Sequence, residues 1–223
     1  MKNKKTSQSK ILRAWIKICT VMLMGILWLI CCLPVITIGA SSAAMYRMMF
    51  NLRSEKECGI GAFFKAFVKK LKISTAVWIV LLLIGVVLRG VPAIFVAMKN
   101  DILTAVGLGI AGALMLLLFV VLVCAFPLCG YFDTTLKKTL RNAVFIATHN
   151  GKQAIIACIL TALPLILFLV DPLIFFYTIG AWVLLYPGLV FYLGAKMFQP
   201  KFEEYDQRHQ EKLLEEKAKE EEA

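Results

Sequence analysis

Long apolar segments alternate with short polar ones along most of this chain. About 20 consecutive apolar residues in a helix cross the hydrocarbon core of a bilayer. The pattern therefore predicts an all-α fold, a polytopic transmembrane helical bundle with about six spans. The expected spans lie near residues 18–33, 35–52, 73–98, 102–129, 153–170 and 173–195, between a basic N-terminus (1–17) and a charged tail (197–223).

Only Pro34 separates the first two apolar segments. Proline lacks the amide hydrogen and clashes with the preceding turn, so it ends or kinks a helix. Residues 39–44 are all Gly, Ala or Ser, and small side chains let helices approach closely in lipid. Residues 18–52 therefore form either two tight spans, which we favour, or a re-entrant hairpin. Both arrangements return the chain to the side where it began.

Two polar intervals carry an amphipathic helical pattern, in residues 60–72 and 133–147. The second follows Pro127, which we expect to break the preceding helix as Pro34 does, and Asp133 is placed to cap the new helix. Basic amphipathic helices lie in the membrane interface or dock against a partner. The residues expected to make this contact are Phe63, Phe64, Lys65, Phe67, Lys69, Lys70, Lys137, Lys138 and Arg141.

The composition supports a membrane environment. The chain is 60% hydrophobic and 17% charged, whereas soluble domains are about 25% charged. Its net charge is +11, and the tail from Lys196 onward holds more acidic than basic residues, so the remainder is more basic still. Because Lys and Arg collect in cytoplasmic loops, we expect both termini and both amphipathic helices in the cytoplasm. No nucleic-acid-binding pattern accompanies the positive charge, so nucleic acid is not an expected partner.

Several classes of chemistry have no pattern in the sequence. The seven cysteines form no C-x-x-C and no Cys/His group with metal-ligand spacing, so we expect neither a metal nor a cofactor. Paired intramembrane carboxylates, a Gly-x-Ser-x-Gly elbow and a Walker motif are also missing. The chain is therefore not expected to be an enzyme or the ATPase subunit of a transporter.

Two sequence blocks point to a family. The first is LPVITIGASSAAMY (33–46), continued by FFKAF (63–67), and the second is FPLCGYFDTTLKKTLRNA (126–143). In these blocks the chain resembles the YesL family of bacterial integral membrane proteins, a domain of unknown function. Members of that family lack an assigned catalytic residue and are often encoded beside sugar ABC-importer components and glycoside-degrading enzymes.

The resemblance implies a non-enzymatic accessory or regulatory factor linked to carbohydrate uptake of the ABC type. Its expected partners are the lipid bilayer and subunits of a sugar ABC importer. A small transporter or channel that acts on its own is the alternative. The predicted spans contain few polar or ionisable groups that could line a path for a substrate, which favours the accessory role.

Overall fold

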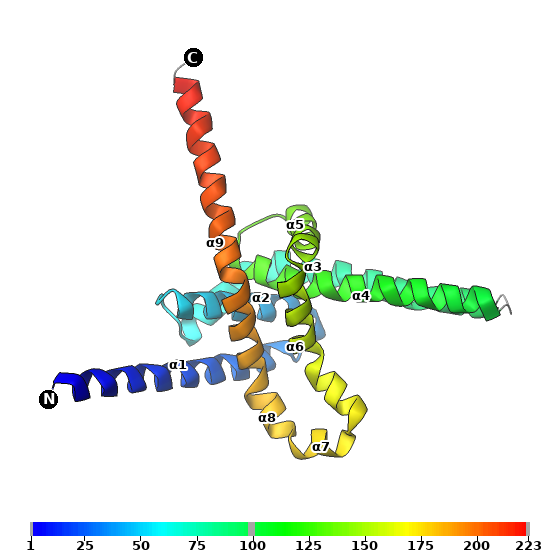
Figure 1. Cartoon of the computed structure of the whole chain (residues 1–223), viewed down its shortest axis with the longest axis horizontal. Coiled ribbons are helices and arrows are strands. Elements are labelled where there is room, and N and C mark those ends of the chain that lie inside the picture. The colour runs from blue at the N-terminus through cyan, green and yellow to red at the C-terminus, as the bar shows by residue number, and fades with distance from the viewer. Residues whose placement is uncertain (1, 98–100, 222–223) are drawn as a thin grey trace.

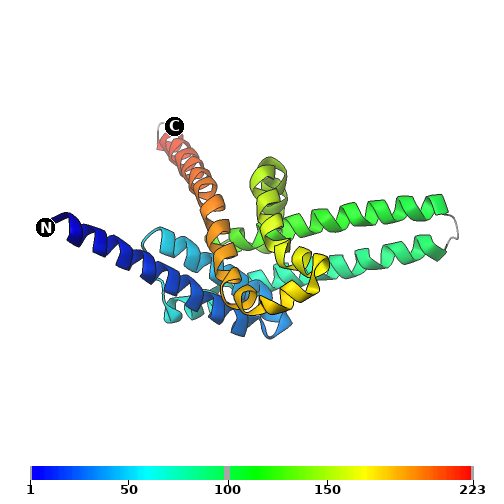
Figure 2. The same cartoon turned by 60° about the horizontal axis from the view of Figure 1, so that its bottom comes forward.

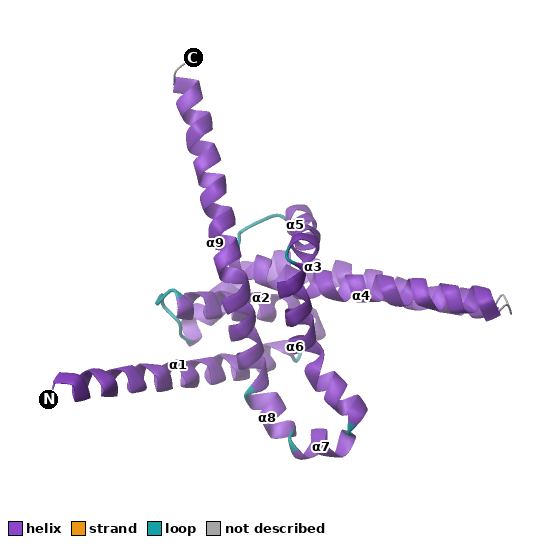
Figure 3. Cartoon of the chain, viewed as in Figure 1, coloured by secondary structure: helices purple, strands orange, loops and turns teal. Residues whose placement is uncertain are grey.

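The computed structural model describes residues 2–97 and 101–221, and these ranges are helical almost throughout (Figure 3). No strand occurs within them, which confirms the all-helical prediction. The helices are α1 (Lys2–Cys32), α2 (Ile38–Arg53), α3 (Ile60–Ala97), α4 (Asp101–Tyr131), α5 (Leu136–His149), α6 (Gly151–Val170), α7 (Pro172–Tyr177), α8 (Ile179–Leu184) and α9 (Tyr186–Glu221). A single 3₁₀ turn, η1 (Val35–Thr37), lies between α1 and α2.

Four helices are long and apolar enough to cross a membrane. Their candidate spans are Trp15–Cys32 in α1, Ile60–Phe95 in α3, Asp101–Tyr131 in α4 and Gly151–Val170 in α6. These segments leave many large apolar side chains exposed, as helices do when lipid rather than water is their solvent. The chain thus has the helices of a membrane-embedded protein.

The other two predicted spans take different forms. Residues 35–52 correspond mainly to α2, which has 16 residues and packs inside the protein. Residues 173–195 are divided among α7, α8 and the start of α9. The division begins at Asp171, whose Oδ1 accepts hydrogen bonds from the amides of Leu173 (3.0 Å) and Ile174 (3.1 Å). With Pro172 as the first helical residue, this cap starts α7 as a new helix.

Helix α2 is the centre of the structure. It packs against α1, α3, α4 and α9, and a run of its residues from Gly39 to Phe50 is almost entirely buried. Figure 1 shows α1 to α4 running along the long direction of the molecule, with α6 and α9 crossing them. Close approach depends on glycine at two contacts of α2. A Cβ on Gly39 would lie 2.4 Å from the carbonyl oxygen of Ser74, and one on Gly130 would lie 2.9 Å from that of Ala43.

Helices α3 and α4 form an antiparallel hairpin that projects well beyond this centre (Figures 1 and 2). The predicted amphipathic helix 60–72 and the predicted span 73–98 belong to one continuous helix, α3, because no glycine or proline occurs between Gly61 and Gly85 to interrupt it. Residue 98 of that predicted span lies outside the described residues.

The expected helix break at Pro127 is wrong. Helix α4 runs through Pro127 and ends at Tyr131, so the chain leaves the helix four residues later than the proline indicates. The proline ring is fully buried, and the surrounding residues 123–125 and 128–130 are buried as well. A proline is tolerated inside a helix where neighbouring protein holds the local geometry. At Pro34, by contrast, the side chain is exposed and α1 has already ended at Cys32.

Candidate functional site

Two neighbouring lysines of α3 meet one carboxylate in the connection between α4 and α5. The Nζ atom of Lys69 lies 2.6 Å from Oδ2 of Asp133, and that of Lys70 lies 2.7 Å from Oδ1. Lys70 also donates to the carbonyl oxygen of Phe132 at 2.6 Å. These contacts connect the first half of α3 to the end of α4, and we call them the lysine latch.

The latch changes the predicted roles of Lys70 and Asp133. The side chain of Lys70 is only 6% exposed, whereas those of Lys69 and Asp133 are 62% and 58% exposed. Lys70 is therefore a buried structural cation and is not free to contact a partner. Asp133 does not cap α5, because Thr135 occupies the N-cap position. Hydrogen bonds from Lys69 and Lys70 lower the pKa of the Asp133 carboxyl group to about 2.

The phenylalanines predicted to make contact in residues 60–72 also differ in burial. Phe63 is fully buried, and Phe67 packs partly buried against the core. Phe64 is exposed, with its ring centroid 5.8 Å from that of Phe63 in an edge-on contact. Lys65 is exposed beside it. Of the contact residues predicted on α3, only Phe64 and Lys65 are therefore exposed without being paired in the latch.

Helix α5 presents its basic edge outward. Thr139 and Ala143 are buried, and the Thr139 hydroxyl lies 2.7 Å from that of Thr134. Lys137, Lys138 and Arg141 are exposed. Among the side chains that the structure describes, ion pairs join Lys69 and Lys70 to Asp133, and Lys201 and Arg208 to Glu204. We define the basic surface as those cations among the predicted contact residues that are exposed and outside these pairs, namely Lys65, Lys137, Lys138 and Arg141.

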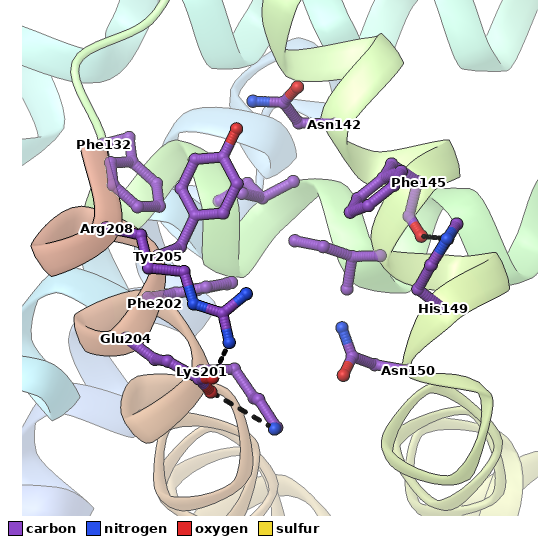
Figure 4. Close-up of a pocket in the computed structure, with 12 residues that line it drawn as sticks. Phe132, Asn142, Phe145, His149, Asn150, Lys201, Phe202, Glu204, Tyr205 and Arg208 are labelled. Carbon is purple, nitrogen blue, oxygen red and sulfur yellow. Dashed lines mark hydrogen bonds and ion pairs between the residues drawn. The ribbon is translucent and has the colours of Figure 1, made fainter. Parts of the chain in front are cut away.

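A cavity of about 270 Å³ lies between α5 and α9, next to the latch (Figure 4). Phe132, Phe202 and Tyr205 form an aromatic wall on one side, with ring centroids 5.5 Å apart for the two phenylalanines. Phe145 and His149 stand on the opposite side with their rings stacked at 3.9 Å. The carbonyl oxygen of Phe145 is 3.2 Å from Nδ1 of His149, so this histidine has a structural contact within its own helix.

The rim of the cavity on α9 is charged. Glu204 lies 2.5 Å from the guanidinium of Arg208 and 3.4 Å from the ammonium of Lys201. These two cations lower the pKa of the Glu204 carboxyl group. Two positive groups facing one negative group leave the rim with a net positive charge, which suits an acidic group rather than a cation.

Two polar contacts that the sequence pattern did not reveal fasten α2 to its neighbours. The guanidinium of Arg47 donates to the carbonyl oxygen of Tyr131 at 3.0 Å, at the end of α4. Arg53 donates to the side-chain oxygen of Gln199 on α9 at 2.9 Å, and Gln199 donates in turn to the Ser54 hydroxyl at 3.0 Å. The sequence shows only that two arginines occur in a largely apolar segment, and this does not identify their acceptors.

No group of three or more His, Cys, Asp or Glu side chains among the described residues is arranged to hold a metal ion. The seven cysteines are all free thiols. The cavity and the latch therefore offer hydrogen bonds, charge and aromatic surface as their available interactions.

Part of the chain matches a known protein family. A family described as "Protein of unknown function, DUF624" matches residues 21–89, which extend from the second half of α1 through most of α3. The match includes the first sequence block and Lys69 and Lys70, and it excludes α5 and the cavity. No curated protein and no solved structure matches the chain.

Proposed function

We propose that this chain is a non-enzymatic accessory or regulatory factor of a carbohydrate ABC importer, and that it acts by contact with a subunit of that importer. The observation that carries the contact role is the basic surface, since Lys65, Lys137, Lys138 and Arg141 are exposed and join none of the ion pairs among the described side chains. Exposed positive charge of this kind guides association with an acidic partner. The resemblance to the YesL family supplies the importer as that partner.

The distribution of buried polar groups favours this role over a transporter that acts on its own. The buried polar residues of the described chain are Ser41, Ser42, Lys70, Ser74, Thr139 and Gln199. Lys70 belongs to the latch, Thr139 lies on the buried face of α5, and Gln199 joins α9 to Arg53 and Ser54. Ser41 and Ser42 lie in α2, and Ser74 packs against Gly39 of that helix. None of them lies in the outer part of the α3–α4 hairpin, where a substrate path would have to continue.

The placement of the helix ends supports a cytoplasmic position for the basic surface. In Figure 1 the N-terminus and the α2–α3 connection lie at the left and the C-terminus at the top, whereas α7 lies at the bottom and the far end of the α3–α4 hairpin at the right. A membrane between these two groups would put both termini on one side. Because this side also carries the basic surface, the preference of Lys and Arg for the cytoplasm assigns it to the cytoplasmic face.

Charge reversal tests the proposal. The variant Lys137→Glu/Lys138→Glu/Arg141→Glu should lower sugar uptake through the importer and lower the amount of importer that copurifies. The matched control is Lys152→Glu, an exposed cation at the start of α6, which should change neither quantity. Membrane level and thermal stability should stay the same in both variants, because these side chains are exposed.

Reconstitution separates the two candidate functions. Liposomes that contain only this chain should show no more sugar flux than empty liposomes. Robust flux in these liposomes would refute the accessory role and establish the transporter. Unchanged uptake and copurification in the charge-reversed variant would refute the proposed contact surface.

A further inference from the structure

The turn between α1 and α2 has an unusual surface. The side chains of Leu33, Val35 and Ile36 are 80%, 59% and 63% exposed, and Pro34 between them is exposed as well. By comparison, the α2–α3 connection has the polar sequence Ser-Glu-Lys-Glu at residues 54–57. Turns in water are rich in polar residues, glycine and proline, because their backbone and side chains meet solvent. The α1–α2 turn presents apolar side chains instead.

Several backbone carbonyl groups of this turn accept hydrogen bonds from side chains of the protein. The Thr37 hydroxyl lies 2.7 Å from the carbonyl oxygen of Cys31 and 2.8 Å from that of Pro34. The Ser41 hydroxyl lies 2.6 Å from the carbonyl oxygen of Thr37. The Thr37 hydroxyl thereby covers the carbonyl group of Cys31, which the end of α1 leaves without a helical partner.

A neighbouring helix provides a further hydrogen bond to the backbone of this turn. The indole Nε1 of Trp78, on α3, donates to the carbonyl oxygen of Val35 at 2.9 Å. Lipid cannot form hydrogen bonds with a backbone, so irregular backbone at membrane depth has to be satisfied by protein groups. The carbonyl groups of Cys31, Pro34 and Val35 meet this condition through the side chains of Thr37 and Trp78.

The contact with Trp78 also fixes how far the turn reaches along α3. Lys72 lies six residues before Trp78, about 9 Å along the helix, and Ala97 lies nineteen residues after it, about 28 Å. Figure 1 shows the α3–α4 hairpin continuing far past the α1–α2 turn in the same direction. The turn therefore ends well short of the far end of the hairpin.

The length of α2 gives a second measure of depth. Its 16 residues span about 24 Å, whereas the hydrocarbon core of a bilayer is about 30 Å thick. Arg53 and the polar connection that follows hold one end of α2 at an aqueous surface. The other end then lies inside the hydrocarbon core, and any tilt of the helix makes it shallower.

We infer that α1 and α2 form a re-entrant hairpin whose apolar turn, Leu33–Ile36, contacts lipid acyl chains and does not reach the far aqueous surface. Both legs of this hairpin enter and leave the membrane on one side. The inference replaces the two-span arrangement favoured from the sequence pattern, and it does not depend on the proposed link to an importer.

Cysteine labelling tests the depth of the turn. In a chain whose native cysteines are replaced, single cysteines would be placed at Ile36, at Lys56 in the α2–α3 connection and at Ala97 at the far end of the hairpin. A membrane-impermeant maleimide should label positions 56 and 97 from opposite sides and leave position 36 at least tenfold less labelled from either side. Impermeant labelling at position 36 within twofold of either control would overturn the inference.

Photocross-linking provides a measurement that keeps the native cysteines. A benzophenone amino acid at Ile36 should form phospholipid adducts that mass spectrometry detects, as should one at Leu83, an exposed apolar residue of α3. Adducts at position 83 without adducts at position 36 would also overturn the inference.

Discussion

The lysine latch predicts that two adjacent lysines differ strongly in their contribution to stability. Replacing Asp133 by asparagine keeps the size of the side chain and removes its charge. The buried ammonium of Lys70 would then keep its hydrogen bond to the carbonyl oxygen of Phe132 and lose its counter-ion. The exposed ammonium of Lys69 would remain hydrated. We therefore expect the loss of stability in Asp133→Asn to come from Lys70.

The surroundings of the pair set the size of the effect. Removing one partner of a fully buried ion pair costs about 3–5 kcal/mol, and pairs exposed to water contribute about 0–1 kcal/mol. Lys70 is 6% exposed and Asp133 is 58% exposed, so the pair is only partly shielded from solvent. We expect a loss of about 1–3 kcal/mol for Asp133→Asn and less than about 1 kcal/mol for Lys69→Gln.

Thermal unfolding in detergent measures this difference. The double variant Lys70→Met/Asp133→Asn should regain part of the stability lost in Asp133→Asn, because a buried charge without a partner is no longer present. Each kcal/mol corresponds to about 2–4 °C in midpoint temperature for a chain of this size. Equal losses of stability in Lys69→Gln and Asp133→Asn would refute the asymmetric latch. A double variant that is less stable than Asp133→Asn would also refute it.

Three further predictions concern other contacts. Gly130→Ala should lower the midpoint temperature because its Cβ would meet the backbone of α2, whereas Gly61→Ala, with no atom within 4 Å of the added Cβ, should not. The pKa of Asp133 is lowered from 3.8 to about 2. The contribution of the latch to the free energy of unfolding should therefore be present above about pH 4 and be lost as the pH falls toward 2. Calorimetry should show this pH dependence in the unmutated protein and not in Asp133→Asn. Trp78→Phe should cost about 1–3 kcal/mol by leaving the Val35 carbonyl without its donor, and equal stability of the two proteins in lipid nanodiscs would contradict the role of that bond.

The sequence pattern was sufficient to predict a membrane environment and an all-helical fold, because apolar segments long enough to cross a bilayer are typical of membrane helices. It was less reliable for where helices end. Pro34 and Pro127 present the same local signal, yet only Pro34 lies at the end of a helix. The difference is that Pro127 is buried among packed neighbours, and burial depends on helices that are distant in sequence. The pair Asp171-Pro172 is typical of a helix start, and in the structure Asp171 caps α7 with Pro172 as its first residue.

The candidate contact residues show the same limit. Helical spacing separates an apolar stripe from lysines, but it does not say which lysine a neighbouring helix covers. Lys70 is buried and Lys69 beside it is exposed because the α4–α5 connection passes over one side of α3. The cavity between α5 and α9 could not be predicted either, since its walls come from residues about 60 positions apart that no local pattern relates.

The central position of α2 has a consequence for biosynthesis. Helix α2 is synthesised early, whereas α9, which packs against it, is synthesised last. Arg53 and Gln199, which hydrogen-bond to each other, are separated by 146 residues. At about 5–20 residues per second, a ribosome needs roughly 7–29 s to cover that distance. During this interval the face of α2 that α9 will cover stays open beside the ribosome. A chain truncated before α9 should therefore be held by membrane insertase or chaperone, or be degraded, even though its long apolar helices are complete.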